Sequence, residues 1–301
     1  MLGRRQIREK VVQTLYAYCQ NPRDNVEVER EMFRNIEKIY NLYIYQLNFL
    51  VALRDLAEQQ VEIAKEKYIK TEKDINPNLK FIQNRILERI ESNQERLSFT
   101  SKHQDLKWSL YDDFLVKTFQ RIIASKRYQD YMASQENSFD EDQKFIGKLF
   151  LKFIAENEAF HELLEDIDMN WADDFHIANS MIQKTIGFMK ENEPTHTLIR
   201  VVKNQEDRDF ARNLLFYGIS HWGESEKKLE ARLQNWDLDR VSLMDRVIII
   251  TAFTELDYFP SIPSRVIINE YIEIAKAFST DKSQVFVNGL LGKYTNEINR
   301  V

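Results

Sequence analysis

Glycine, proline and cysteine are scarce in this chain, and each scarcity excludes a class of structure or site. The 301 residues include 7 glycines, 5 prolines and a single cysteine, Cys19. So few turn-forming residues argue against a β-rich fold, and one cysteine excludes an internal disulfide or a multi-cysteine zinc site. Because 43% of the residues are hydrophobic and 30% are charged, a balance typical of amphipathic helices, we predict an all-α fold.

The chain also lacks long apolar runs and an excess of positive charge. No segment approaches the roughly 18 apolar residues that cross a bilayer, and the N-terminus is charged from Arg4 onward with no signal-peptide core behind it. We therefore expect a cytoplasmic protein without a membrane partner. The net charge of −6 argues against polyanion binding over the whole surface, so a nucleic-acid site must be local.

Motifs that carry catalysis are missing as well. The sequence contains no glycine-rich phosphate loop, no GxSxG elbow, no HExxH and no CxxC. Glu158 and His161 have the i, i+3 spacing of carboxylate di-iron bundles, but such a site needs further inward-facing glutamates, for which the sequence gives no pattern. We expect a protein that is not an enzyme and that holds no metal and no cofactor.

The first segment predicts a helix with a basic start. Ile7, Val11, Leu15 and Tyr18 follow helical spacing, and Arg4, Arg5, Arg8 and Lys10 lie on other faces. Positive charge at a helix N-terminus opposes the helix dipole, and an external anion would offset this cost. The cluster therefore has two readings, a solvated charged end or a contact with nucleic acid.

Residues 24–97 predict a long antiparallel helical hairpin. Apolar or small residues recur every three or four positions in 36–68, the pattern breaks at Pro77, and Leu79, Ile82, Ile86 and Ile90 restart it. This row of apolar residues has two interpretations: packing within the chain or an interface with another protein. Residues 98–107 read as a loop and 106–124 as a helix rich in aromatic residues, and Ser138 with Glu141 resembles a capping box that opens the next helix.

A comparison of the sequence with itself suggests an internal repeat. Residues 145–182 match 210–247 without a gap at an offset of 65, and the matches include Asn170–Trp171 with Asn235–Trp236. Shared helical periodicity explains the apolar matches but not readily the Asn–Trp pair, so a degenerate repeat within 138–192 is a hypothesis.

The last third of the chain is the most informative stretch. Ser242 can cap a helix whose third residue is Asp245, an apolar helix follows, and a loop with Pro260 and Pro263 leads to the next helix. We expect Asp281 to cap the last helix, in which Gly289 permits close approach of a neighbouring backbone. These helices predict a compact bundle.

Several blocks in this stretch resemble the NusB transcription antitermination family. They are DR at 239–240, DRVIIITAFTEL at 245–256, IP at 262–263, INEYIEIAK at 268–276 and FVNGLL at 286–291. Upstream, RDFARNLLFYGI from Arg208 fits the preceding helix, and RRQIREKVVQTLYAY resembles the arginine-rich RNA-binding helix of the family. The resemblance covers residues 1–20 and 205–301, which leaves 21–204 as a helical insertion that ordinary NusB proteins lack.

The resemblance implies a non-catalytic adaptor that binds RNA. Together with NusE, a small-subunit ribosomal protein, such an adaptor binds single-stranded boxA RNA and helps RNA polymerase to antiterminate on ribosomal RNA operons. Carried over by position, the RNA-binding residues are Arg4, Arg5, Arg8, Lys10, Gln13, Tyr16, Lys282 and Phe286. Asp245 would face NusE. Lys282 departs from the family pattern, because some relatives carry an acid there.

Two other functions stay open at this point. One is a helical protein–protein interaction scaffold that keeps the NusB fold but has lost RNA binding and works through the 24–97 hairpin. The other is the NusB-like domain of RNA methyltransferases, which requires an attached catalytic domain with a glycine-rich cofactor loop that this sequence lacks.

Overall fold

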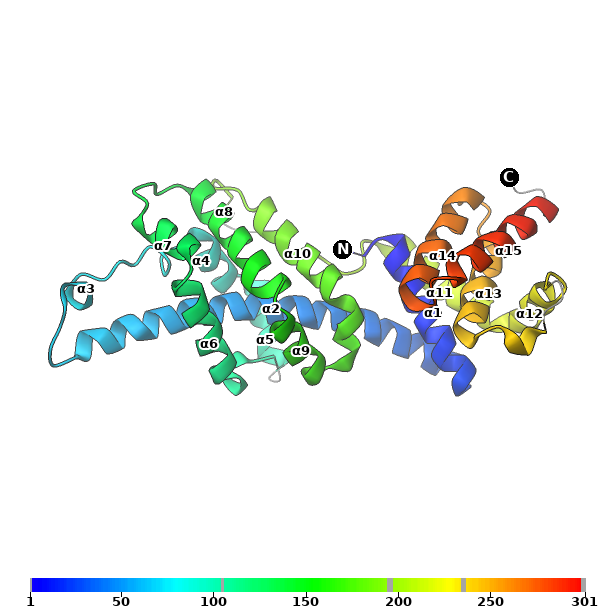
Figure 1. Ribbon diagram of the computed structural model, residues 1–301, viewed down its shortest axis with the longest axis horizontal. Helices are drawn as coiled ribbons and strands as arrows, with labels where there is room; N and C mark the ends of the chain where they lie inside the picture. Colours follow the sequence, from blue (N-terminus) through cyan, green and yellow to red (C-terminus); the bar gives the residue numbers. More distant parts are fainter. Residues whose placement is uncertain (1, 104–105, 194–196, 234–236, 299–301) are drawn as a thin grey trace. The chain divides into compact units, whose positions relative to one another are not determined.

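The computed structural model describes residues 2–103, 106–193, 197–233 and 237–298. These residues form helices and connections without a β-strand, which confirms the predicted all-α fold (Figure 1). The α-helices are α1 (Arg4–Gln20), α2 (Asn25–Glu66), α3 (Glu72–Ile75), α4 (Arg85–Glu91), α5 (Gln94–Lys102), α6 (Asp112–Ile123), α7 (Lys126–Ala133), α8 (Phe139–Phe150), α9 (Glu158–Ile167), α10 (Phe175–Phe188), α11 (Gln205–Ser220), α12 (Trp222–Glu230), α13 (Leu243–Tyr258), α14 (Ser264–Phe278) and α15 (Ser283–Glu297). Short 3₁₀ segments are η1 (Trp108–Leu110), η3 (Met169–Asp174) and η4 (Leu238–Arg240), and η2 (Leu151–Ala155) is a π-helical stretch.

The chain divides into two compact units. The terminal unit comprises Met1–Ile36 and Val202–Val301, so it joins the two ends of the sequence. The central unit comprises Glu37–Val201. Helix α2 starts within the terminal unit and continues into the central one.

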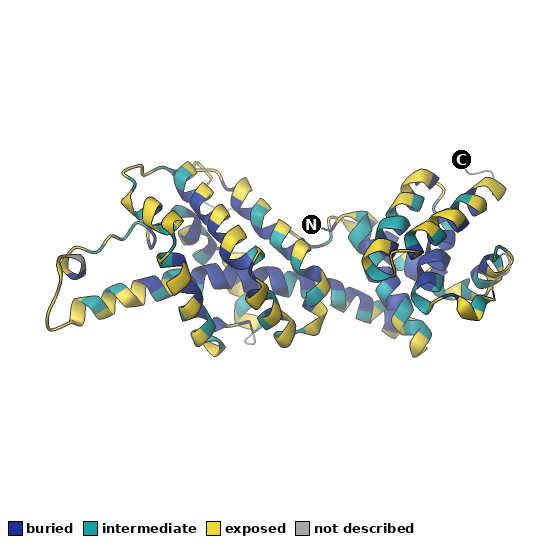
Figure 2. Ribbon diagram, viewed as in Figure 1, coloured by how far each residue is buried: buried dark blue, intermediate teal, exposed yellow. Residues whose placement is uncertain are grey.

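Helix α13 is the centre of the terminal unit. Every residue from Val247 to Leu256 is buried, and α1, α11, α12, α14 and α15 all pack against this helix (Figure 2). A helix that is apolar on all sides is stable only when neighbours cover it completely, which explains the uninterrupted apolar run in its sequence. Glu255, which is fully buried, is the one ionisable side chain in that run.

The ends of the bundle helices are only partly as expected. The Ser242 hydroxyl accepts a hydrogen bond from the backbone N–H of Asp245 at 3.1 Å, so Ser242 caps α13 as expected. Asp281 does not cap α15. The N-cap position is Lys282, without a side-chain cap, and hydrogen bonds among the Ser279, Thr280 and Ser283 hydroxyls stabilise the connection instead.

The central unit is built around aromatic side chains of α2. Tyr45 stacks on Trp108 with ring centroids 4.3 Å apart, and Phe49 contacts Phe160 at 5.0 Å. The indole N–H of Trp108 donates to the backbone carbonyl of Tyr45 at 2.8 Å, so this large ring is buried with its polar atom satisfied. The single helix expected over 106–124 is divided in the structure, with Trp108 in η1 and the helix proper, α6, running from Asp112 to Ile123.

The expected 24–97 hairpin differs in its second arm. The first arm is the long helix α2, but the returning chain forms two short helices, α4 and α5, separated at Asn93. The side chains of Asn84 and Asn93 cap the two helices, and the buried Arg96 guanidinium bonds to the backbone carbonyls of Ile90 and Glu91. Asparagine caps thus break an arm whose apolar spacing alone predicts continuity. Helix α5 also replaces much of the loop predicted for 98–107.

The two halves of the suspected repeat have the same order of elements. Helices α8, α9 and α10 follow one another as α11, α12 and α13 do, with η3 and η4 at corresponding places. Four matched pairs are buried in both halves: Phe145 with Phe210, Leu149 with Leu214, Leu164 with Leu229, and Ile182 with Val247. Asn235 and Trp236 lie outside the described residues. Duplication within 138–192 stays a hypothesis.

Candidate nucleic-acid interface

Arg8 lies inside the terminal unit and not on its surface. Its side chain is 2% exposed, and its Nε donates to Glu255 Oε2 at 2.8 Å. The hydroxyl of Tyr271, also buried, donates to the same oxygen at 2.9 Å. Burial opposes the charge on Arg8, but the hydrogen bond and charge of Glu255 outweigh it and raise the pKa of Arg8. The expectation that Arg8 meets phosphate is therefore corrected: its charge is already neutralised within the bundle.

Arg4 and Arg5 remain partly exposed at the start of α1. Their side chains are 35% and 41% exposed. Arg4 pairs with Glu206 and Asp207 of α11, and Arg5 makes a bidentate pair with Glu270 of α14, with both N···O distances 3.0 Å. The hydrogen bonds that Arg5 donates to Glu270 raise the pKa of Arg5. Pairs this exposed are worth about 0–1 kcal/mol, so a phosphate can compete for these arginines.

The other expected RNA contacts on α1 differ in exposure. Lys10 is buried at 6% exposure, whereas Gln13 and Tyr16 are half-buried. In the same helix, Leu15 reaches the backbone of α11, where a Cβ at Gly218 would lie 2.9 Å from a Leu15 methyl group. Of the four cations of α1, only Arg4 and Arg5 are thus exposed enough to form part of an RNA-binding surface.

Asp245 holds the connection between α14 and α15. It is 9% exposed, and its carboxylate accepts hydrogen bonds from the hydroxyls of Ser279 at 2.8 Å and Ser283 at 3.1 Å. Because that connection leads directly to Lys282 and Phe286, Asp245 fixes the backbone that carries two of the expected RNA contacts.

Lys282 and Phe286 lie one turn apart at the start of α15. Lys282 is exposed and Phe286 is half-buried, and the backbone N–H of Phe286 donates to the carbonyl of Lys282 at 3.3 Å. Phe286 also lines a surface pocket of about 320 Å³ together with Arg232, Leu233, Val285, Gly289, Leu290 and Lys293. This pocket combines apolar walls with two cations, a composition suited to a base and its phosphate.

The second half of α1 and the start of α15 lie at the same end of α13. Arg8 meets Glu255 near the end of α13, whereas the thiol of Cys19 lies within electrostatic reach of Arg246 in its first turn. Asp245, in that same turn, binds Ser283 of α15. Segments more than 260 residues apart in the sequence therefore approach one end of the bundle, whereas Arg4 and Arg5 lie toward the other end of α1.

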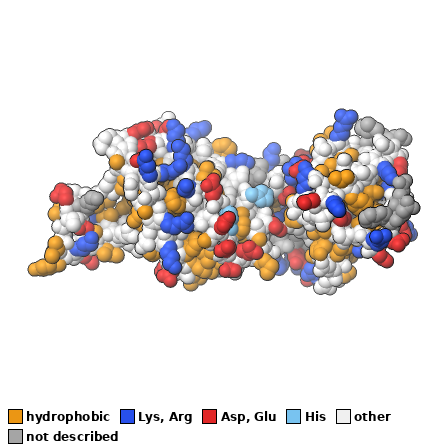
Figure 3. Space-filling model, viewed as in Figure 1, with side chains coloured by type: hydrophobic (Ala, Val, Ile, Leu, Met, Phe, Trp, Pro, Cys, Tyr) orange, Lys and Arg blue, Asp and Glu red, His pale blue; other side chains and the backbone are white. Residues whose placement is uncertain are grey.

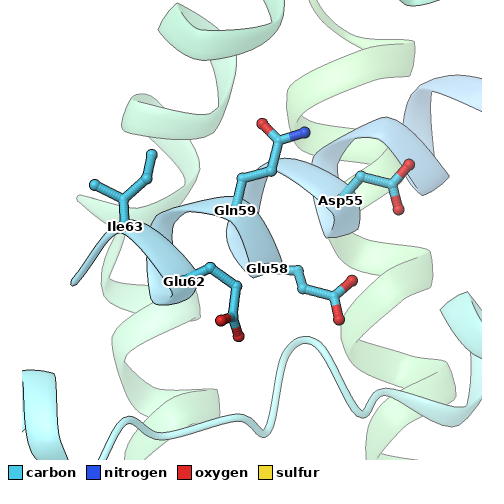
Figure 4. Close-up of a pocket in the computed structure, with 5 residues that line it drawn as sticks. All are labelled: Asp55, Glu58, Gln59, Glu62 and Ile63. Atoms are coloured by element: carbon cyan, nitrogen blue, oxygen red, sulfur yellow. The ribbon is translucent and has the colours of Figure 1, made fainter. Parts of the chain in front are cut away.

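A larger pocket in the central unit has the opposite charge. It has a volume of about 630 Å³ and is lined by Asp55, Glu58, Gln59, Glu62 and Ile63 of α2 (Figure 4). Burial and the neighbouring Glu91 raise the pKa of Asp55. Three carboxylates would repel phosphate, so this pocket is unsuited to RNA.

Glu255, Glu270 and Tyr271 organise the arginines of α1, and sequence reasoning missed them. A signal was available, because a glutamate in the otherwise apolar run of α13 requires a buried cation as partner. Within the described ranges no helix is long and apolar enough to cross a membrane, and no three His, Cys, Asp or Glu side chains gather as metal ligands would.

Comparisons with known proteins support the resemblance seen in the last third of the chain. The sequence profile of the NusB family matches residues 176–296. The transcription antitermination protein NusB of Myxococcus xanthus is 40% identical over 100 residues, which are 32% of this chain and 71% of that protein. NusB of Lysinibacillus sphaericus is 36% identical over 96 residues, covering 32% and 76% of the two chains. NusB of Bacillus velezensis is 33% identical over 105 residues, which are 35% of this chain and 81% of that protein.

Proposed function

The chain belongs to the NusB family, and from this premise we propose that it is a non-catalytic RNA-binding protein of transcription antitermination. In this proposal it binds single-stranded boxA-type RNA, weakly alone and more tightly with NusE, and it joins the antitermination complex of RNA polymerase on ribosomal RNA operons. It acts by binding, without turnover.

The observation that carries the proposal is that α1 and α15 both pack against α13, with the second half of α1 and the start of α15 at the same end of that helix. RNA contacts drawn from both segments require this arrangement, which rests on Cys19 with Arg246 and on Asp245 with Ser283. Tyr16 and Phe286 supply aromatic rings at this end on which unpaired bases stack, and Arg4 and Arg5 supply exchangeable charge toward the opposite end of α1. Lys282 adds a cation at the start of α15.

The proposal assigns different roles to the four cations of α1. Arg4 and Arg5 contact phosphate, because weak exposed ion pairs can be exchanged. Arg8 positions the helix, because a phosphate would have to displace a buried carboxylate to reach it. Lys10, at 6% exposure, is assigned the same supporting role.

Asp245 is proposed to connect the binding of NusE with the binding of RNA. The resemblance assigns it to the NusE surface, and its bonds to Ser279 and Ser283 tie that surface to the first turn of α15. This link offers a route by which NusE strengthens RNA binding, since order imposed at one surface reduces the entropy lost at the other.

An RNA titration tests the proposal. A fluorescent boxA oligonucleotide is titrated with wild type and with the Arg4→Gln/Arg5→Gln variant, with and without NusE, over a range of salt concentrations. Loss of two phosphate contacts should lower the salt slope for single-stranded RNA by about 1.4. Arg30→Gln/Arg34→Gln is the matched control, because it removes the same charge from exposed residues of α2 in the terminal unit. Equal salt slopes for wild type and Arg4→Gln/Arg5→Gln would reject the assignment.

A helical interaction scaffold is the second candidate function, and one observation favours it. Ile63, Tyr68 and Ile69 at the far end of α2 and just beyond it are 64%, 102% and 81% exposed. Exposed apolar side chains of this kind often mark protein-binding sites. The scaffold predicts no boxA binding in either arm of the titration, so the same experiment separates the two functions.

A further inference from the structure

Helices α8 and α10 of the central unit pack side by side in opposite directions. The Gln183 amide donates to the carbonyl of Gly147 at 3.1 Å, and the Gln143 amide donates to the carbonyls of Ile186 and Met189 at 2.7 and 2.9 Å. The pair therefore presents a fixed outer face. Figure 1 shows the two helices adjacent along the central unit.

Lysines follow this outer face. Lys144, Lys148 and Lys152 recur every four residues along α8 and η2, and Lys184 lies on α10; all four are exposed. Lys144 pairs with Asp140, but Lys148, Lys152 and Lys184 make no ion pair within the part of the chain that the structure describes. Figure 3 shows Lys and Arg side chains gathered over α8.

An exposed aromatic ring accompanies the lysines. Phe188, the last residue of α10, is 69% exposed and lies one turn after Lys184, so the two side chains are neighbours on the helix surface. Gly187 between them leaves open space where a Cβ would stand. A ligand can therefore approach the backbone closely beside both the cation and the ring.

We propose that this surface, formed by Lys148, Lys152, Lys184 and Phe188, binds single-stranded RNA that flanks the boxA element. Uncompensated cations attract phosphates, and an exposed ring stacks on unpaired bases whatever their sequence. The inference rests on the proposed function, because it extends the length of RNA that the protein contacts. It also gives the central unit a role of its own.

The composition of the surface favours RNA over an acidic protein. Cations alone would suffice to bind an acidic protein. Such a partner would not explain the exposed aromatic ring of Phe188 beside Lys184. The acids of α8, Asp140, Glu141 and Asp142, are confined to its first turn, and Glu158, Glu162, Glu165 and Asp166 lie on α9. The second half of α8, η2 and α10 therefore carry lysines and no acidic residue, although the chain as a whole is acidic.

Two RNA probes test the inference. One is the boxA core alone, and the other is the same core with unstructured flanks of about 16 nucleotides on each side, near the upper site size of single-strand-binding folds. Wild type should bind the flanked probe more tightly than the core. The Lys148→Gln/Lys152→Gln/Lys184→Gln variant should lose this advantage, and its salt slope on the flanked probe should fall by about 2.

The aromatic ring is tested separately. Phe188→Ala should weaken binding of the flanked probe by about fivefold or more without changing the salt slope, because stacking releases no counterions. Matched controls are Lys102→Gln/Lys107→Gln/Lys117→Gln, which removes three exposed charges of the same unit, and Leu110→Ala, which truncates a side chain that is 70% exposed. Neither control should alter binding.

The outcomes distinguish this inference from the function on which it rests. A wild-type chain that binds the core but gains nothing from the flanks overturns the inference and leaves the proposed function intact. A chain that binds neither probe, with or without NusE, overturns both. If the triple lysine variant keeps the full advantage of the flanks, the RNA contacts lie elsewhere and the surface is wrongly assigned.

Discussion

The guanidinium of Arg8 and the carboxylate of Glu255 form a buried ion pair that joins the first helix to the centre of the terminal unit. The Nε to Oε2 distance is 2.8 Å, and the side chains are 2% and 0% exposed. Tyr271 donates to the same carboxylate, so helices α1, α13 and α14 meet at one charged cluster. An arginine that by sequence resembles an RNA ligand is thus part of the core.

Removing one member of this pair should be strongly destabilising. Arg8→Met leaves Glu255 charged and buried, which costs roughly 3–5 kcal/mol. Arg8→Met/Glu255→Leu should recover part of the loss, because neither charge then remains inside. Urea denaturation of the full chain measures both, and Arg5→Gln, which breaks only the exposed pair with Glu270, should cost under about 1 kcal/mol. Equal costs for Arg8→Met and Arg5→Gln would contradict the buried-pair interpretation.

Asp245→Ala should loosen the connection between α14 and α15. Two serine hydroxyls lose this acceptor. Ser283 is buried, so leaving its hydroxyl unsatisfied costs at most about 1–3 kcal/mol, whereas Ser279 is half-buried and can bond to water. Amide hydrogen exchange in residues 279–284 should become faster than in wild type. Asp281→Ala, which removes an exposed carboxylate from the same connection, is the control. Unchanged exchange rates in Asp245→Ala would show that the connection is ordered by other contacts.

The thiol of Cys19 should react slowly at neutral pH. Burial raises its pKa to about 11, against the effect of the nearby Arg246, which lowers it. Since the thiolate is the reactive form, alkylation of the folded chain should accelerate up to about pH 11, whereas the urea-unfolded chain should reach its plateau near the ordinary thiol pKa. Because the folded pKa is the higher one, any stability from this group is present at neutral pH and is lost as the pH rises through about 11. Equal alkylation profiles for the folded and unfolded chains would refute the burial of the thiol.

Asp55→Asn should stabilise the chain at pH 7. Burial, followed by the charges of Glu91 and Glu58, raises the pKa of Asp55 in the folded state, so folding favours its protonated form. The stability linked to this group is therefore present below its unfolded pKa and is lost as the pH rises through the folded value. The Tm of the asparagine variant should be higher than that of wild type at pH 7, and the two Tm values should be equal at pH 3. Glu62→Gln, at an acid of the same helix whose side chain is 63% exposed, is the control.

The sequence was sufficient for the helical class and for much of the bundle, and the reasons can be traced to particular residues. The apolar run of α13 and the Ser242 cap depend on local spacing, and both are present in the structure. The prediction for the second arm of the 24–97 hairpin was wrong, because Asn84 and Asn93 cap two separate helices. Apolar periodicity continues across such a break, so periodicity alone does not reveal it.

The candidate site was harder to predict, because exposure depends on partners distant in the sequence. Arg4, Arg5 and Arg8 look alike in α1, yet only Arg8 faces α13, where Glu255 lies 247 residues further along the chain. Likewise, the partners of the Asp245 carboxylate, Ser279 and Ser283, lie more than 30 residues away. No local pattern in α1 distinguishes a cation that meets solvent from one that meets a buried acid.

The separation between Arg8 and Glu255 also determines the order in which the protein can fold during synthesis. Helix α1 leaves the ribosome first, but its partners follow 247 residues later, a delay of roughly 12–50 s at ordinary translation rates. The central unit, which is continuous in sequence, is complete before α11–α15 emerge. Throughout that interval α1 lacks α11, α13 and α14, against which it packs in the folded protein, so the bundle of the terminal unit can form only after the central unit has been synthesised.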